Sequence, residues 1–532
     1  MRWTTDRASS RDVLLLAAVT VFLSTIWIWP HAAHLRQVPD RGDPAFSAWR
    51  LARFAHQLRH DPAHLFDGNI FYPRPYTLAY SDATLLEGAV AAPFIWAGVE
   101  PLLVANGLFL IAFPLCGLAF FHAGWRLTGN PMAGTVTGVL GAWYPFHAEH
   151  YSHLELQWFM FVPLVFVALV DTIIDPNWRR GLRIGALLAL QCLASMYLGL
   201  MLATVLVPLT AVALLRYRIP SFPRLLSALA AAAAVALPVA ALLSVPYNQA
   251  RAAHGERVVQ EVRAGSATPG DYLKTSRRLA TYAWHTRQFN RPERELYPGT
   301  STLSLATIGL LALPSGSALP VLAAGLAAFD WSLGLNGLTY RSLSALSPFR
   351  SIRVPARFAV LTGAALILLA GYGAHRVVTR GTRTWQLVLT MGLVATVLLD
   401  LRVKTELVDY YANIPSLYEH ITPDAVLAEL PTGHEIDYMY FSTQHWAHLL
   451  SGYSGFIPAD AGLSEDLSLF PAPQAIEGLR ARGATHLTYN CAFERSVERC
   501  RHNQAELAGN PHVEIMATEI WLGGSVQLYR LR

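Results

Sequence analysis

The run Val13-Leu-Leu-Leu-Ala-Ala-Val-Thr-Val-Phe-Leu-Ser-Thr-Ile-Trp-Ile-Trp-Pro30 decides the fold class. It has 18 residues and no charged side chain, and a helix of about that length crosses a hydrocarbon core of roughly 30 Å. The run resembles the apolar core of a signal peptide, but no small-residue cleavage site follows it. We therefore expect an uncleaved first transmembrane helix.

Ten further apolar runs continue this pattern along the chain. They lie at 102–125, 131–146, 157–175, 181–197, 198–216, 224–246, 300–314, 317–335, 357–377 and 384–401. Charged residues make up only 14% of the 532 residues and hydrophobic residues 53%, whereas soluble proteins carry about 25% charged residues. The sequence predicts a polytopic α-helical membrane protein with about eleven spans.

The excess of basic residues fits a membrane protein better than a nucleic-acid-binding one. All but two of the 41 basic residues are arginines, and the net charge is only +5. The short loops at 175–183, 216–224 and 375–385 each carry arginine, which places them in the cytoplasm under the positive-inside rule. We expect a bacterial cytoplasmic membrane protein with no nucleic-acid partner.

This topology places three long segments outside the cytoplasm. They are a first loop at 31–101, a second loop at 247–299 and a terminal domain at 402–532, so the membrane domain is 1–401. Leu85–Val99 is apolar, but a full span there would invert every later loop. We expect it to be a re-entrant or interfacial helix.

The terminal domain at 402–532 is predicted to be a small α/β domain. Short mixed runs at 425–430, 486–489 and 525–529 are typical of strands. Gly483 follows the end of a short helix. Cys491 and Cys500 form a disulfide if this side is oxidising, or remain two thiols.

The chain has no Walker loop, dinucleotide fingerprint, nucleophile elbow or HExxH motif. The sequence therefore does not support a nucleotide-driven enzyme or a soluble hydrolase. The candidate residues lie in the predicted outer loops instead. In Gly42-Asp43-Pro44, Asp43 either caps the helix that Pro44 opens or acts as a general base with a pKa raised by partial burial. Asp82 and Glu87 precede or begin an apolar helix, so they either face a polar cleft or, for Asp82, cap that helix.

The segment Tyr144-Pro-Phe-His-Ala-Glu-His-Tyr-Ser-His153 gathers ionisable groups at a predicted membrane edge, where they usually face a cavity. His147 with His150, or His150 with His153, are three residues apart and would share one helical face. This arrangement suits a phosphate or a divalent metal held by His147, Glu149 and His150. The alternative is an interfacial belt of His and Tyr that binds no ligand. No cofactor is certain.

Three arginines precede a predicted span on the side that the positive-inside rule disfavours. Arg350, Arg353 and Arg357 surround Pro355, which should open the helix. Guanidinium forks at a helix N-terminus suit a phosphate. The alternative is that the arginines snorkel to lipid headgroups.

Together these pieces resemble the GT-C membrane glycosyltransferases, and more closely their bacterial YfhO-like and dolichyl-phosphate-mannose-type members. Gly42-Asp43-Pro44 looks like the acidic motif of the first outer loop, and 147–155 occupies the position of the second. Phe349–Arg357, Tyr438–Trp446 and Gly452–Gly455 are similar to YfhO-like segments. His147-Ala-Glu149 replaces the metal-binding Asp-x-Asp or Asp-x-Glu form of oligosaccharyltransferases.

The resemblance implies transfer of a sugar from a polyprenyl-phosphate carrier to a glycan, lipid or protein acceptor on the outer face of the membrane. Asp43 would deprotonate the acceptor, Arg353 and Arg357 would hold the departing phosphate, and an in-line attack would invert the anomeric carbon. The alternative is a non-enzymatic scaffold or a lipid-linked glycan flippase, although a transporter should show mid-membrane charges and internal repeats.

Overall fold

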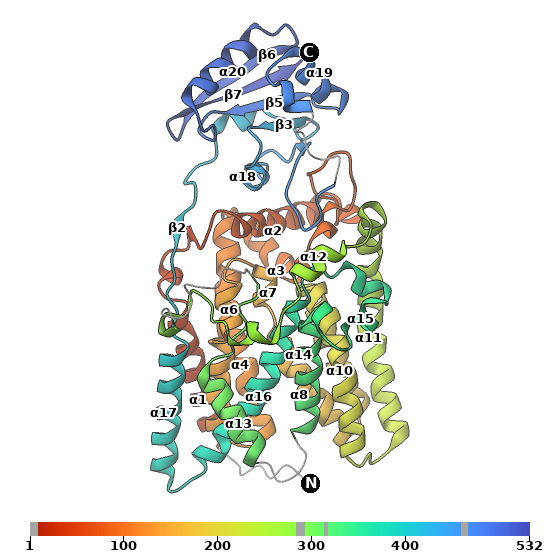
Figure 1. Ribbon diagram of the computed structural model, residues 1–532, viewed down its shortest axis with the longest axis vertical. Helices are drawn as coiled ribbons and strands as arrows, with labels where there is room; N and C mark the ends of the chain where they lie inside the picture. The colour runs from red at the N-terminus through yellow and green to blue at the C-terminus, as the bar shows by residue number, and fades with distance from the viewer. Residues whose placement is uncertain (1–8, 283–292, 313–317, 459–465) are drawn as a thin grey trace. The chain divides into compact units, whose positions relative to one another are not determined.

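The computed structural model describes residues 9–282, 293–312, 318–458 and 466–532 (Figure 1). The chain divides into two compact units, which we describe separately. The first unit comprises Met1–Leu35, Asn106–Ser244 and Gly255–Leu407, and the second comprises Arg36–Ala105, Val245–His254 and Val408–Arg532. Most of the expected first outer loop therefore belongs to the same unit as the terminal domain.

An α-helix lies at each of the eleven apolar runs. These helices are α1 (Ser10–Trp27), α4 (Pro101–Thr128), α5 (Pro131–Ala142), α8 (Phe161–Ile174), α9 (Trp178–Ala194), α10 (Met196–Arg216), α11 (Phe222–His254), α13 (Thr300–Ala312), α14 (Leu319–Ser332), α16 (Ala359–Val378) and α17 (Arg383–Asp400). In the described part of the chain, six helical segments are long and apolar enough to cross a membrane. The protein is a polytopic helical membrane protein, and the total of eleven spans stays a prediction.

Helix α16 is the centre of the first unit. It packs against α13, α14, α5, α8 and α17, and 83% of its most apolar window is buried. Small residues allow its backbone to approach α13 closely, because a Cβ on Gly309 would overlap the Leu369 carbonyl and one on Gly373 would overlap that of Leu305. Short elements connect the long helices: α6 (Pro145–Glu149), α7 (Leu154–Gln157), α12 (Val259–Ala264), α15 (Tyr340–Ser344) and a 3-10 turn at Pro355–Phe358.

The second unit combines two helices with a mixed sheet. α2 (Asp43–His60) packs on α3 (Leu85–Trp96), an apolar helix shorter than the candidate spans. β1 (Gln37–Val38) pairs antiparallel with β2 (Val408–Asp409). The larger sheet has the order β4-β3-β5-β7-β6, with bounds β3 (Val426–Leu430), β4 (His448–Leu449), β5 (His486–Asn490), β6 (Val513–Trp521) and β7 (Gly524–Leu531). The three predicted strands are confirmed as β3, β5 and β7.

Three helices accompany this sheet: α18 (Glu435–Phe441), α19 (Pro473–Ala481) and α20 (Val497–Gly509). The core between them is aliphatic and aromatic, and includes Leu430, Ile476, Leu487, Leu507 and Tyr529. Gly483 follows α19 with a φ of 95°, a conformation that favours glycine. The predicted helix end at Gly483 is confirmed.

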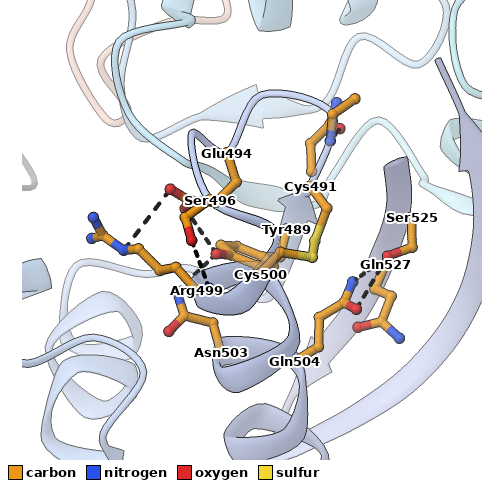
Figure 2. Close-up of a disulfide and its surroundings, with 12 residues drawn as sticks. Tyr489, Cys491, Glu494, Ser496, Arg499, Cys500, Asn503, Gln504, Ser525 and Gln527 are labelled. Carbon is orange, nitrogen blue, oxygen red and sulfur yellow. Dashed lines mark hydrogen bonds and ion pairs between the residues drawn. A yellow bond between two sulfur atoms is a disulfide. The ribbon is translucent and has the colours of Figure 1, made fainter. Parts of the chain in front are cut away.

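A disulfide joins the start of α20 to the loop after β5, which decides between the two alternatives for Cys491 and Cys500 (Figure 2). Their Cα atoms are 5.6 Å apart. Beside the bridge, Asn503 donates to the Tyr489 hydroxyl at 2.7 Å, and that hydroxyl donates to Glu494 at 2.9 Å. The disulfide and this hydrogen-bonded chain hold α20 against the sheet.

Glu429 places a carboxyl group inside the core of this sheet. It is 1% exposed in β3, and the hydroxyls of Tyr418 (3.0 Å) and Thr488 donate to it. Burial raises the pKa of Glu429 to about 8, despite the opposing effect of the two hydroxyls. The carboxyl is therefore protonated at neutral pH.

We predict that Glu429→Gln weakens the pH dependence of stability. Because the pKa of Glu429 is higher in the folded than in the unfolded chain, its stabilising effect is complete below about pH 4.5 and is lost as the pH rises through 8. The wild type should lose roughly 2.7 kcal/mol between pH 6 and pH 9 from this group, and the glutamine variant should not. Thermal unfolding of the full chain in detergent at both pH values measures the difference. Glu419→Gln, at an exposed carboxylate, is the control, and equal pH dependence in all three proteins would contradict the prediction.

Candidate functional site

The first candidate site lies at the N-terminal end of α16, in the first unit. Pro355 opens the 3-10 turn that leads into this helix, as the sequence predicted. Tyr197, at the start of α10, fixes the preceding residue: its hydroxyl donates to the Val354 carbonyl at 2.7 Å, and the Val354 N–H donates to that hydroxyl at 3.1 Å. These two bonds set the position of Arg357 on the first turn.

Arg357 forms a buried, bidentate ion pair with Glu293. Its Nε lies 2.7 Å from one carboxylate oxygen and its Nη2 lies 2.8 Å from the other, and the side chains are 11% and 18% exposed. The guanidinium also lies 5.4 Å from the ring centroid of Tyr197. Burial alone would raise the pKa of Glu293, but the charge and hydrogen bonds of Arg357 outweigh it and hold that pKa well below its usual range. The charge of Arg357 is already balanced by a residue of the protein.

A pair of carboxyl groups lies next to this ion pair. The Glu293 N–H donates to Glu149 at 3.0 Å, and Glu149 is hydrogen-bonded to Glu295. Burial, followed by the charge of Glu295, raises the pKa of Glu149, and burial also raises that of Glu295. Since two carboxylates at contact distance do not both ionise, the pair holds a proton at neutral pH.

His150 presents a buried imidazole to the same region. It is 1% exposed, and neither ring nitrogen has a hydrogen-bond partner among the residues that the structure describes. Burial lowers its pKa, while the charge of Glu293 acts in the opposite direction. A neutral imidazole carries one donor and one acceptor nitrogen, and burying both without partners is costly. This makes His150 a candidate ligand-binding group.

The helical spacing predicted for these histidines is wrong. α6 ends at Glu149, and His153 is the N-cap of α7, so a turn rather than one helix face brings His150 and His153 to 5.6 Å between ring centroids. Gln157 stabilises this turn, because its amide donates to the His150 carbonyl at 2.5 Å.

His147 belongs to the packed interior. Its ring lies 4.6 Å from Phe113 and 4.7 Å from Phe159 between centroids, and its Nδ1 lies 2.6 Å from the Gln157 Oε1. Within 9–282, 293–312, 318–458 and 466–532, no group of three His, Cys, Asp or Glu side chains is arranged to hold a metal ion. The contacts of His147 are those of a core histidine.

Two more arginines lie beside the ion pair. The segment with α12 packs on the segment before α16: the Ala356 N–H donates to the Gly265 carbonyl at 3.0 Å, and a Cβ on Gly265 would overlap the Arg353 carbonyl. Arg353 is exposed and has no hydrogen-bond or ion-pair partner in the described part of the chain. Its charge, together with burial as the larger cause, lowers the pKa of Arg257. Arg257 is paired with Glu261 at 3.6 Å, so Arg353 is the one of these two arginines whose charge no carboxylate balances in the described part of the chain.

Arg350 does not join this cluster. It pairs with Glu256 at 2.9 Å on the surface, where the two side chains are 46% and 52% exposed, and its Nη2 donates to the Ala345 carbonyl at 3.0 Å. An exposed pair of this kind contributes little to stability, so Arg350 serves best as a control.

The remaining candidates belong to the second unit. α2 begins at Asp43 with Gly42, rather than Asp43, as its N-cap. The half-buried Asp43 carboxylate therefore lies in the first turn, where the helix dipole favours negative charge. Almost all of the first four turns of α2 are buried, so the position of Asp43 is fixed by packing.

Asp82 and Glu87 lie in and after the loop that packs on α2, and Asp82 contacts a buried arginine of that helix. Arg50 is 2% exposed and donates to the Asp82 carbonyl at 2.6 Å. Arg53 donates to the Asp67 carbonyl at 3.0 Å. Thr84, not Asp82, is the N-cap of α3, and Glu87 is fully buried in its first turn. The Arg50 bond fixes the loop that contains Asp82.

Sequence analysis missed four residues of the first site: Tyr197, Arg257, Glu293 and Glu295. The mixed charges of Glu293-Arg-Glu295 directly before a predicted span were a usable signal, because such charges usually have partners. Tyr197 sits at the end of an apolar run and Arg257 within the second outer loop, and neither gave a comparable signal.

We found no matching protein family and no curated protein of similar sequence. Several solved structures share the fold, including the following two. The arabinofuranosyltransferase AftD from mycobacteria has a TM-score of 0.61 at 16% identity, over 99% of this chain and 42% of that chain. ArnT from Cupriavidus metallidurans, bound to undecaprenyl phosphate, has a TM-score of 0.52 at 12% identity, over 98% of both chains.

These likenesses confirm the fold expected from the GT-C resemblance. The chain spans less than half the length of AftD. The finer resemblance to the YfhO-like group stays a prediction.

We predict that Arg357 and Glu293 act as one structural unit. Glu293→Gln or Arg357→Met leaves a buried charge without its partner and should cost on the order of 3 kcal/mol, seen as a lower Tm of the full chain in detergent. The double variant should lose clearly less stability than the two single variants added together, because either substitution alone already breaks the ion pair. Arg350→Met is the control and should cost less than about 1 kcal/mol. Additive losses in the double variant would contradict the coupling.

Proposed function

We propose that the protein is a membrane glycosyltransferase that moves a sugar from a polyprenyl-phosphate carrier to an acceptor outside the cytoplasm. The observation that carries the proposal is the exposed guanidinium of Arg353, four residues before Arg357, whose own charge Glu293 balances. The fold shared with AftD and with ArnT, the latter crystallised with undecaprenyl phosphate, supports it.

The site must stabilise the negative charge that develops on the carrier phosphate as it leaves. A phosphate is a good leaving group once its developing charge is stabilised, so cations at the site contribute more than a proton donor. Arg353 holds the phosphate in this proposal, and Arg357 maintains the local geometry through Glu293. Arg257, which is paired with Glu261, lies near Arg353. This assignment to Arg353 differs from the expectation that Arg357 itself holds the phosphate, because that would require Glu293 to leave.

Asp43 is the proposed base. A carboxylate fixed in the first turn of a buried helix meets the positional demand of general-base catalysis. It would remove the proton from the acceptor hydroxyl as that oxygen attacks the anomeric carbon, and the carrier phosphate would leave from the opposite face with inversion. The Cys491–Cys500 disulfide supports the assignment of the terminal domain to an oxidising compartment.

The first test separates a phosphate site from arginines that contact lipid headgroups. Arg353→Lys keeps the charge but loses the planar fork, so binding of a short-chain polyprenyl-phosphate sugar to the purified protein should fall roughly tenfold. Arg350→Lys, in the same segment but paired with Glu256, should bind like the wild type. Equal affinity in all three proteins would favour a scaffold, because snorkelling needs only a charge on a flexible stem.

The second test concerns the base. Asp43→Asn keeps a polar residue in the first turn of α2, so the protein should still fold, but transfer should fall by roughly 10² or more. Asp61→Asn, just after the other end of α2, is the matched control and should retain activity. Transfer is measured with the same carrier and a membrane extract as acceptor source. Full activity of Asp43→Asn would restrict Asp43 to a structural role.

A further inference from the structure

A pocket of about 430 Å³ lies within the second unit. Its walls come from the turn between α3 and α4, the segment 411–414 and the end of α18. This volume falls within the range of small-molecule sites, roughly 300–1,000 Å³. We call it the α3–α18 pocket, and none of the candidate residues above lines it.

Part of the lining of the α3–α18 pocket is polar but uncharged. Asn413 and Gln444 contribute amide groups, which both donate and accept hydrogen bonds. The Thr443 hydroxyl donates to the Tyr440 carbonyl at 2.8 Å and can still accept. The Tyr440 hydroxyl donates to Glu100 at 3.2 Å, and Arg36 lies 3.4 Å from the same carboxylate. The one acidic group of the lining is thus already engaged.

No lysine, arginine or histidine lines the α3–α18 pocket in the described part of the chain. Two arginines outside the lining contact it, Arg36 at Glu100 and Arg41 at Tyr411, so a phosphate or carboxylate ligand would meet no cation of the lining itself. A ligand rich in hydroxyl groups would be matched, because each hydroxyl both donates and accepts hydrogen bonds, and the tyrosine rings offer faces for its apolar C–H groups.

The lining also includes apolar residues, one of them on α3, a helix that exposes several apolar side chains. Ile95, Val99 and Ile414 line the pocket. On α3, Val90, Phe94 and Trp96 are 40%, 53% and 44% exposed, and the indole of Trp96 donates to the Ala55 carbonyl of α2 at 3.0 Å. An exposed apolar helix beside a polar pocket fits a ligand whose head is polar and whose tail is apolar.

The polar rim is preformed. The indole of Trp521 donates to the Asn413 carbonyl at 2.9 Å. The ring of Tyr411 lies 5.1 Å from that of Trp521 and 5.1 Å from the Arg41 guanidinium. A wall held in place before binding costs less to order when the ligand arrives.

We propose that the α3–α18 pocket binds the sugar headgroup of a membrane-anchored acceptor, with the anchor lying along α3. The assignment rests on the proposed function, which requires an acceptor, and it names the acceptor's class: a glycan carried on an apolar tail. The polar residues of the lining form hydrogen bonds with the sugar hydroxyls, and its apolar residues contact the start of the tail.

The test measures binding of octyl β-D-glucoside, octyl α-D-mannoside and octyl β-D-galactoside, below their micelle concentrations, to the full chain in phosphatidylcholine nanodiscs. Saturation-transfer NMR reports on the sugar-ring protons. At least one glycoside should bind to the wild type, and the double variant Asn413→Ala/Gln444→Ala should bind it roughly tenfold more weakly. Both residues are exposed, so the fold should persist. Gln474→Ala, an exposed glutamine of α19, should bind like the wild type.

Two results would overturn the assignment. The first is a ring signal that is absent for all three glycosides or equal in the double variant. The second is equal binding of the corresponding methyl glycosides, which would indicate a soluble glycan instead of an anchored one. The assay needs neither carrier nor turnover. If the protein binds glycosides but transfers no sugar, the proposed transferase function is refuted and the pocket assignment is not. If sugar transfer depends on Arg353 but no glycoside binds, the pocket assignment is refuted and the transferase function is not.

Discussion

The buried ion pair between Arg357 and Glu293 is the constraint on which the first site depends. It joins the start of α16, the central helix of its unit, to the segment that leads into α13. Through the Glu293 N–H it also fixes Glu149 at the end of α6. A buried pair of this kind adds little net stability over an apolar alternative, but removing either partner is costly. The ion pair therefore selects one arrangement of these segments, while adding little to the free energy of folding.

The same pair decides which charges remain for a ligand. Had Arg357 been the only cation near Pro355, the site would be neutral. The close approach of the α12 segment at Gly265 brings Arg257 near Arg353, and like charges held together are unfavourable unless an anion is bound or water screens them. Glu261, 3.6 Å from Arg257, offsets part of this repulsion, and an anion bound at Arg353 would offset more. His150, buried without a partner in the described part of the chain, adds a neutral donor or acceptor beside these charges.

The sequence predicted the elements better than the contacts between them. Apolar length alone located the helices, and alternation with turn residues located β3, β5 and β7, because these signals are local. Gly42 instead of Asp43, and Thr84 instead of Asp82, occupy the N-cap positions, an error of one or two residues that is usual at helix ends. The histidine spacing failed because a turn interrupts the helix after Glu149. Glu293 and Arg357 are 64 residues apart, and no local pattern encodes such a pairing.

The two candidate sites, the arginines before α16 and the α3–α18 pocket, differ in charge and therefore in the kind of ligand that each would bind. The arginine cluster offers cations and a buried imidazole, which suit a phosphate. The α3–α18 pocket offers tyrosines, amides and a hydroxyl, and its carboxylate is engaged by Tyr440 and Arg36. A lipid phosphate would meet no cation of the lining in that pocket, whereas sugar hydroxyls would exchange water for matched partners at little cost. A transferase must keep donor and acceptor from occupying each other's positions, and two sites of different electrostatic character contribute to this.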